Sequence, residues 1–154
     1  MRRADKEIKD YQEIAAIMKK AIVCRISLVD GDCPYIVPVN FAIHENHLYF
    51  HSAMEGKKID ILRKNNKVCF EMDVSTEIIK GKEPCFWGMK YLSVIGFGQA
   101  FFIENPGEKK KVLDLLMEKY AGTDSFSYNE KIFKKALAID VRIEKISGKK
   151  SRMP

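Results

Sequence analysis

The sequence has few of the features that mark a secreted, membrane-bound or metal-binding protein. It contains four cysteines in 154 residues, none of them in a C-x-x-C pair, so neither a structural zinc site nor a disulfide framework is expected. No apolar run approaches the roughly 20 residues that a transmembrane helix needs. The charged start of the chain leads into no apolar signal segment. We therefore expect a cytoplasmic protein with reduced cysteines, no bound metal and no membrane partner.

Internal repeats and low-complexity linkers are also missing. At 154 residues, with 46% hydrophobic and 31% charged residues, the composition is that of a globular protein with a substantial core. We expect one domain over residues 1–148, followed by a short basic tail over residues 149–154.

Positive charge is in excess. The formal net charge is +6 and the sequence pI is about 9.1, which suggests an anionic partner such as a phosphorylated cofactor, a nucleic acid or an acidic surface. The aromatic residues do not interleave with the lysines as in a known nucleic-acid-binding module, so a nucleic-acid partner is not expected.

Periodicity in the first third of the chain predicts one helix followed by a β-meander. Apolar residues at helical spacing predict a helix over residues 6–20, with Asp5 as its N-cap. Period-two patterns predict strands over residues 21–28, 35–43 and 47–52. Pro38 cannot donate a ladder hydrogen bond, so its strand must have an edge or a bulge there.

The remainder continues the pattern of strands with a few helices. We predict a helix over 57–64, a strand over 68–74, a loop over 75–84, a strand over 89–103, a helix beginning at Asn105-Pro106 and a last strand over 137–146. Gly96 and Gly98 indicate a bend or a close approach to the backbone. The sum is a mainly β protein, an antiparallel β-barrel with flanking helices.

The segment over 50–58, FHSAMEGKK, carries the most chemistry. A predicted strand delivers the side chains of His51 and Ser52, Gly56 permits a sharp turn, and Lys57 and Lys58 stand where a helix begins. Helix N-termini have unpaired N–H groups, so this junction suits a phosphate. The same lysines also fit a basic helix face in water, and His51 also fits a structural role at a strand end. Both interpretations stay open on spacing alone.

Three segments together identify a family. PYIVPVNF over 34–41, YFHSA and GKK within 49–58, and SVIGFG over 93–98 closely resemble the nitroimidazole-resistance proteins. These belong to the pyridoxamine 5′-phosphate oxidase-related, FMN-binding split-barrel group. RRxD at the start of the chain and Gly148-Lys149 near its end also resemble that family, so the resemblance covers nearly the whole chain.

The resemblance implies a homodimer that holds FMN at its interface, with an antiparallel, Greek-key-like split barrel in each subunit. It places the backbone of residues 37–40 along the flavin ring. His51 and Ser52 match positions beside the ribityl chain and phosphate, and Lys57 and Lys58 match the pair that binds the phosphate. Ser93 matches a polar contact to the flavin. Trp87 and Tyr91 are candidates to cover the flavin ring, and ordinary aromatic packing is the alternative for both. The cofactor-binding residues so implied are Val37, Pro38, Val39, Asn40, Phe50, His51, Ser52, Lys57, Lys58, Trp87, Tyr91 and Ser93.

The expected function is an FMN-dependent oxidoreductase, nitroreductase-like, that acts on a small-molecule substrate and uses His51 as its candidate catalytic residue. The alternative is a flavin or haem carrier or sensor without turnover of its own. Pyridoxamine 5′-phosphate oxidases proper end in a basic substrate-binding segment, which this chain is too short to supply, so vitamin B6 oxidation is not the first expectation. His44 and His47 fall on a predicted hairpin turn and are expected to face solvent.

Overall fold

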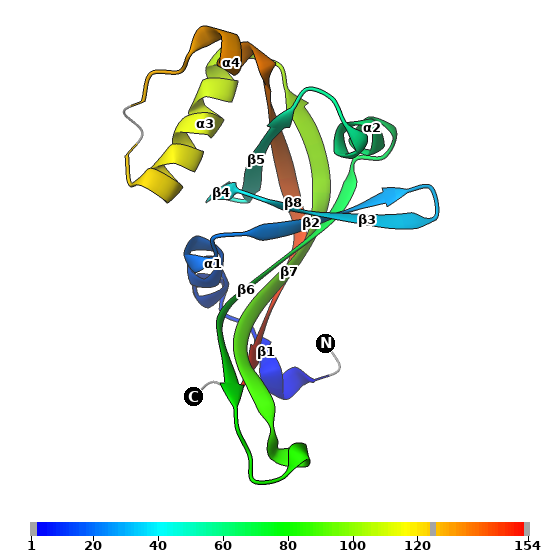
Figure 1. Cartoon of the computed structure of the whole chain (residues 1–154), viewed down its shortest axis with the longest axis vertical. Helices are drawn as coiled ribbons and strands as arrows, with labels where there is room; N and C mark the ends of the chain where they lie inside the picture. The colour runs from blue at the N-terminus through cyan, green and yellow to red at the C-terminus, as the bar shows by residue number, and fades with distance from the viewer. Residues whose placement is uncertain (1–2, 124–125, 153–154) are drawn as a thin grey trace.

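In the described part of the chain, a single antiparallel sheet of eight strands forms the centre of the protein (Figure 1). The computed structural model describes residues 3–123 and 126–152. The strands are β1 (Glu7–Ile8), β2 (Cys24–Asp30), β3 (Cys33–Val39), β4 (Phe41–His44), β5 (His47–Ala53), β6 (Lys67–Ile79), β7 (Gly88–Ile103) and β8 (Ala136–Ser151). The α-helices are α1 (Tyr11–Lys20), α2 (Lys57–Lys64), α3 (Pro106–Ala121) and α4 (Glu130–Lys135), and short 3₁₀ turns cover Ala4–Lys6 and Pro84–Phe86.

The sheet bends round because its two ends are consecutive in the chain. Hydrogen-bonded neighbours follow the order β3-β2-β6-β7-β8-β5-β4, with β1 added beside β8. The two outermost strands, β3 and β4, are separated only by Asn40. The single strand predicted over 35–43 is therefore two strands, and Asn40 is the corner at which the chain changes its partner from β2 to β5.

The core lies on the inner face of this bent sheet. Alternation places Val37 and Val39 inward, opposite Ile26 and Cys24 on β2. Pro38 is exposed on the outer face, opposite Arg25. β3 is an edge strand, a position in which a proline is tolerated because its missing N–H can face away from the sheet. The predicted edge position of this proline is confirmed.

Two helix starts illustrate what local sequence can and cannot decide. Asn105 caps α3 as predicted, with its side chain accepting hydrogen bonds from the amides of Gly107 and Glu108. The predicted start of the first helix was wrong. Asp10, not Asp5, caps α1 by accepting from the amide of Gln12, while Glu7 and Ile8 form β1 against the end of β8.

Strands β6 and β7 form a long arm that runs away from the helices α2 and α3 (Figure 1). Residues 75–79, predicted to be loop, belong to β6, because the strand resumes at Glu77 after a shift of register past Val74. The close approach predicted at Gly96 is confirmed, since the ring of Phe70 occupies the space that a Cβ atom would need there.

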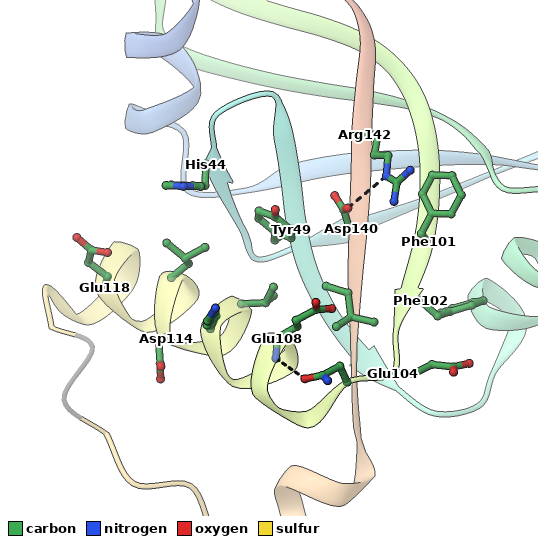
Figure 2. Close-up of a pocket in the computed structure, with 15 residues that line it drawn as sticks. His44, Tyr49, Phe101, Phe102, Glu104, Glu108, Asp114, Glu118, Asp140 and Arg142 are labelled. Carbon is green, nitrogen blue, oxygen red and sulfur yellow. Dashed lines mark hydrogen bonds and ion pairs between the residues drawn. The ribbon is translucent and has the colours of Figure 1, made fainter.

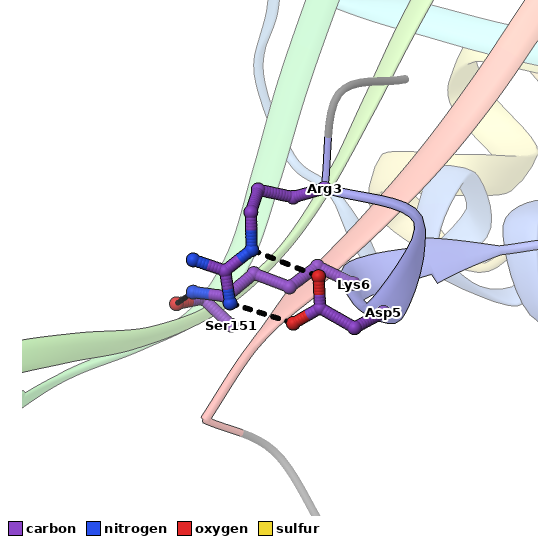
Figure 3. Close-up of polar contacts among 4 residues, drawn as sticks. All are labelled: Arg3, Asp5, Lys6 and Ser151. Atoms are coloured by element: carbon purple, nitrogen blue, oxygen red, sulfur yellow. Dashed lines mark hydrogen bonds and ion pairs between the residues drawn. The ribbon is translucent and has the colours of Figure 1, made fainter.

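The two described ends of the chain meet on this arm (Figure 3). Residues 149–151, assigned from sequence to a basic tail, are part of β8 and pair with β7. Lys6 Nζ donates to Ser151 Oγ at 3.2 Å. Beside it, Arg3 and Asp5 form an exposed two-bond ion pair, which lowers the pKa of Asp5 to about 2 mainly through the hydrogen bond from Arg3.

The structure also bears on the state of the cysteines and on membrane-spanning helices. All four cysteines are free thiols, and Cys24 is fully buried while Cys33 and Cys85 are exposed. Within the residues that the structure describes, no helix combines the length and the apolar character needed to cross a membrane.

Candidate functional site

The junction between β5 and α2 forms as the sequence predicts. Helix α2 spans Lys57–Lys64, and Gly56 precedes it with φ 115° and ψ 165°, a conformation essentially restricted to glycine. Gly56 has no side chain with which to cap the helix. The first-turn amides, including those of Lys57 and Lys58, therefore point out of the helix toward any ligand or solvent at this end.

The two lysines at this helix start are in different states. Lys57 Nζ lies 3.4 Å from Asp30 Oδ2 and 5.0 Å from the centre of the Tyr35 ring, so its charge already has a partner. Lys58 is half-buried, with Nζ 5.5 Å from the centre of the Phe50 ring. Among the described residues, no carboxylate forms an ion pair with Lys58, and its partial burial lowers the pKa of its ammonium group. Lys58 is thus a desolvated cation without a counter-charge.

His51 lies close enough to Lys58 to feel its charge. Partial desolvation first, and the charge of Lys58 second, lower the pKa of His51 below its ordinary value of 6.5. The lowered pKa favours the neutral imidazole, whose unprotonated ring nitrogen can accept a proton or coordinate a metal ion. Alternation along β5 separates the two predicted neighbours, since Ser52 shares the face of buried Phe50 and His51 is exposed on the other.

The β3 edge approaches the same junction. The contacts of Lys57 with Asp30 and Tyr35 bring the start of α2 against the β2–β3 hairpin. Val37 follows Tyr35 on the same face, and the exposed Asn40 ends the segment. Because β3 pairs on one side only, alternate backbone groups along its free edge have no strand partner. The structure thus brings Phe50, His51, Lys57 and Lys58 together at this junction, with Lys57 touching the β2–β3 hairpin. Val37, Pro38, Val39 and Asn40 continue the chain from Tyr35 along β3 and into the corner, and Ser52 follows His51 on the opposite face of β5.

The remaining predicted residues lie elsewhere in the same chain. His51 pairs across the sheet with Ala138 near one end of β8, whereas Ser93 pairs with Lys149 near the other end. The two positions are separated by roughly 35 Å of extended strand. Tyr91 lies beside Ser93 on the arm, under Lys149, whose hydrogen bond lowers the pKa of the phenol. Trp87 is 48% exposed where the arm turns back.

Sequence reasoning missed a polar cluster on another flank of the barrel, formed by His47 with Asp140 and Arg142; the last two are drawn in Figure 2. His47, expected in solvent, is half-buried, and its Nδ1 lies 2.7 Å from Asp140 Oδ1. Arg142 Nε lies 3.7 Å from the other oxygen of Asp140. Asp140 and Arg142 line a groove of about 880 Å³ under α3, and none of the predicted site residues lines this groove. Only the β5–β8 register reveals this cluster, and the sequence does not state that register. His44 is exposed, as expected.

Comparison with known proteins identifies the fold and the family. A family profile described as "Pyridoxamine 5′-phosphate oxidase" matches residues 10–150. The structure of a candidate 5-nitroimidazole antibiotic resistance protein from Bacteroides thetaiotaomicron is 33% identical, covers 93% of this chain and 85% of that one, and superposes with a TM-score of 0.83. An FAD- and haem-binding protein from Mycobacterium smegmatis has a TM-score of 0.85 at 16% identity, over 96% of this chain and 74% of that one.

Among curated proteins, an uncharacterized protein of Rhizobium meliloti (strain 1021) is 36% identical over 65 residues. That match spans 42% of this chain and 42% of the relative.

The bent antiparallel sheet and the likeness to these structures define a split barrel of the kind found in flavin-binding proteins. The predicted fold class is confirmed. The chain belongs to the pyridoxamine 5′-phosphate oxidase family, and its structure is similar to that of the candidate 5-nitroimidazole antibiotic resistance protein of B. thetaiotaomicron.

Proposed function

We propose that this protein is an FMN-dependent oxidoreductase of the nitroreductase type, with each cofactor held between two copies of the chain. The observation that carries the proposal is Lys58, a half-buried cation at the start of α2. Among the described residues it has no carboxylate partner, and no side chain caps the helix. Burial of such a charge is costly unless an anion compensates it. A phosphate group supplies that anion and also accepts from the free amides of α2.

Family membership and two relatives support this assignment. The B. thetaiotaomicron relative is described as a candidate 5-nitroimidazole resistance protein, and the M. smegmatis structure is described as binding FAD and haem. A phosphate-bearing flavin such as FMN suits this subsite, because Lys58 and the free amides of the first turn of α2 together present positive charge at one point, with Lys57 beside them. The β3 edge from Val37 to Asn40 offers unpaired backbone groups for the edge of a flat ring.

The chain's own residues position the cofactor and handle the proton. Bound flavin supplies electron transfer, for which the chain provides orientation, charge and exclusion of water. Lys58 and the first-turn amides hold the phosphate, while Lys57 orients the β2–β3 hairpin through Asp30. His51, whose pKa is lowered by partial desolvation and by the charge of Lys58, is the residue placed to accept or deliver a proton.

A second copy completes the site in this proposal. Ser93, Tyr91 and Trp87 lie at the far end of the long strands from His51, so they reach the flavin of another subunit rather than their own. The arm exposes apolar side chains that a partner subunit would cover, at Ile78 (61%), Phe86 (61%) and Met89 (47%).

The test compares ligands with and without the phosphate. FMN and riboflavin are titrated into the wild type, Lys58→Gln and Lys64→Gln, and quenching of flavin fluorescence is measured. We expect FMN to bind the wild type at least about tenfold more tightly than riboflavin, a preference that Lys58→Gln reduces several-fold and Lys64→Gln, at the other end of α2, retains. Equal affinity of the wild type for both ligands would contradict the phosphate site. Tighter binding of FAD than of FMN would identify FAD as the cofactor.

Turnover is tested with the flavin-loaded protein, NAD(P)H and a 5-nitroimidazole under anaerobic conditions, by the loss of nitro-group absorbance. The second candidate function is that of a flavin or haem carrier. The neutral imidazole of His51 favours it, since neutral histidine is a common metal ligand. A Soret band in the purified protein that disappears in His51→Ala would support haem binding, and retained flavin without turnover would support a carrier.

A further inference from the structure

Lys119 is a half-buried amine outside the site described above. It lies near the end of α3 and reaches between α1 and β4. Its Nζ donates to the carbonyl oxygen of Met18 at 3.1 Å and stands 3.6 Å from the centre of the Phe41 ring. Among the described residues, no carboxylate forms an ion pair with it.

Lys119 lines a groove of about 620 Å³ between α1, α3 and β4. Its walls are mainly apolar, with Ala15, Met18, Ile43 and Leu115 among the lining residues. Ionisable groups stand around it on each element that contributes to it, namely Tyr11, Lys19, His44, Glu45 and Glu118. A volume of this size accommodates a small molecule beside the lysine.

Opposing effects act on the Lys119 charge. The Met18 carbonyl at the end of α1 and the face of Phe41 favour the ammonium form. Burial opposes it and prevails, and lowers the pKa of Lys119 to about 8. The neighbouring Cys24 thiol offers no thiolate to restore the charge, because burial raises its pKa to about 12. About a tenth of Lys119 is therefore neutral at pH 7, far more than for an ordinary lysine.

We propose that Lys119 and its groove form a second site, which binds small aldehydes with an apolar body and holds them as a reversible imine. The amine nitrogen attacks the carbonyl carbon and forms a C–N bond. The resulting carbinolamine then loses water, whose oxygen comes from the carbonyl group and whose two hydrogens come from the amine. The step is neither an oxidation nor a reduction, so it needs no further reactant.

The test uses 3-methylbutanal with cyanoborohydride at pH 7, which converts an imine into a stable secondary amine. Peptide mass spectrometry then gives the rate of alkylation at each lysine. Lys110 is the internal comparison, because it lies on the same helix and is exposed, with Nζ 2.7 Å from Asp114. We expect Lys119 to react at least about tenfold faster than Lys110, because of its larger neutral fraction. Its rate should also saturate with aldehyde concentration, as binding in a groove requires.

Two alanines on α1 provide matched variants. Ala15 lines the groove, whereas its neighbour Ala16 is exposed outside it. Ala15→Leu should slow the reaction of Lys119 several-fold and leave Lys110 unchanged, and Ala16→Leu should affect neither lysine. Equal rates at Lys119 and Lys110 would overturn the proposal. A fast rate at Lys119 that neither saturates nor responds to Ala15→Leu would also overturn it, because the amine would then be reactive without a binding site.

Discussion

The phenol of Tyr120 holds the amide of Phe41 at the corner where the barrel changes strands. The Phe41 N–H donates to Tyr120 Oη at 3.0 Å, and the same hydroxyl donates to the carbonyl oxygen of Ile22 at 2.8 Å. Phe41 immediately follows Asn40, so α3 fixes the point at which β3 ends and β4 begins. The candidate site therefore depends on a helix that contributes no residue to it.

Tyr120→Phe tests this link. The substitution removes the acceptor for the Phe41 N–H, and an unsatisfied backbone donor of this kind costs about 1–3 kcal/mol of the free energy of unfolding. Urea unfolding followed by circular dichroism measures the loss. Tyr11→Phe is the control, because Tyr11 is a 45% exposed aromatic on α1. An equal effect of the two substitutions would contradict the role of Tyr120.

Lys58→Gln should raise the pKa of His51. In the wild type, desolvation and then the Lys58 charge hold that pKa below 6.5, and the substitution removes the second cause. The pKa should therefore move toward its ordinary value, as measured by NMR titration of the imidazole resonances. Lys57→Gln should leave it unchanged, because Lys57 is directed toward Asp30 and Tyr35. A shift of equal size in both variants would contradict the separate placement of the two lysines.

The sequence predicted those parts of the fold that local chemistry decides. Glu55-Gly56 predicted the start of α2, and Asn105-Pro106 that of α3, because each signal acts within one helical turn. The end of β6 was missed because Ser75 has φ 57° and the register shifts before Glu77, so the apolar alternation is broken where the strand continues. Similarly, the His47–Asp140 contact depends on the pairing of β5 with β8, which brings together residues 93 positions apart.

The candidate site likewise has one part that local sequence predicts and another part that depends on long-range folding. The segment 50–58 was predictable because strand, glycine and lysines are adjacent in sequence. The different states of its two lysines were not predictable, since Asp30 reaches Lys57 only through the folding of the β2–β3 hairpin against α2. The separation of Ser93 from His51 was equally hidden, because it follows from the length and register of β8.

Gly56→Asn should lower the free energy of unfolding by about 1–3 kcal/mol. Glycine adopts the backbone conformation of φ 115° and ψ 165° without strain, whereas a residue with a side chain is strained there. No neighbouring atom obstructs a Cβ at this position, so the cost lies in the backbone alone. Gly31→Asn is the matched control. Gly31 has φ 67°, in the left-handed region that asparagine tolerates, and its Cβ position is also open. Thermal unfolding of the two variants should therefore differ, and equal melting temperatures would contradict this explanation.

Lys119 should make the stability of the protein depend on pH in the alkaline range. Its pKa is about 8 when folded and near 10.5 when unfolded, so the unfolded chain binds the extra proton between these values. The contribution of Lys119 to stability therefore rises as pH increases from 8 to 10.5. Relative to Lys119→Met, the wild type should gain free energy of unfolding between pH 7 and pH 10, as measured by urea unfolding. Lys110→Met, at an exposed position of the same helix, is the control for the loss of a lysine side chain. An equal pH-dependent difference in both variants would contradict the assignment to Lys119.

Mixing two inactive variants tests whether two copies share one flavin site. In the proposal, one subunit supplies Lys57 and Lys58 and the other supplies Trp87 and Tyr91. A Lys57→Ala/Lys58→Ala variant and a Trp87→Ala/Tyr91→Ala variant should each lose most FMN binding alone. When they are unfolded together and refolded as a mixture, half of the dimers pair one variant with the other, and each such dimer regains one intact site. We therefore expect recovery of about a quarter of the wild-type flavin capacity, measured by gel filtration with absorbance at the flavin band. If both groups of residues served a site within one chain, the mixture would bind no more flavin than the separate variants, and this outcome would exclude the shared site.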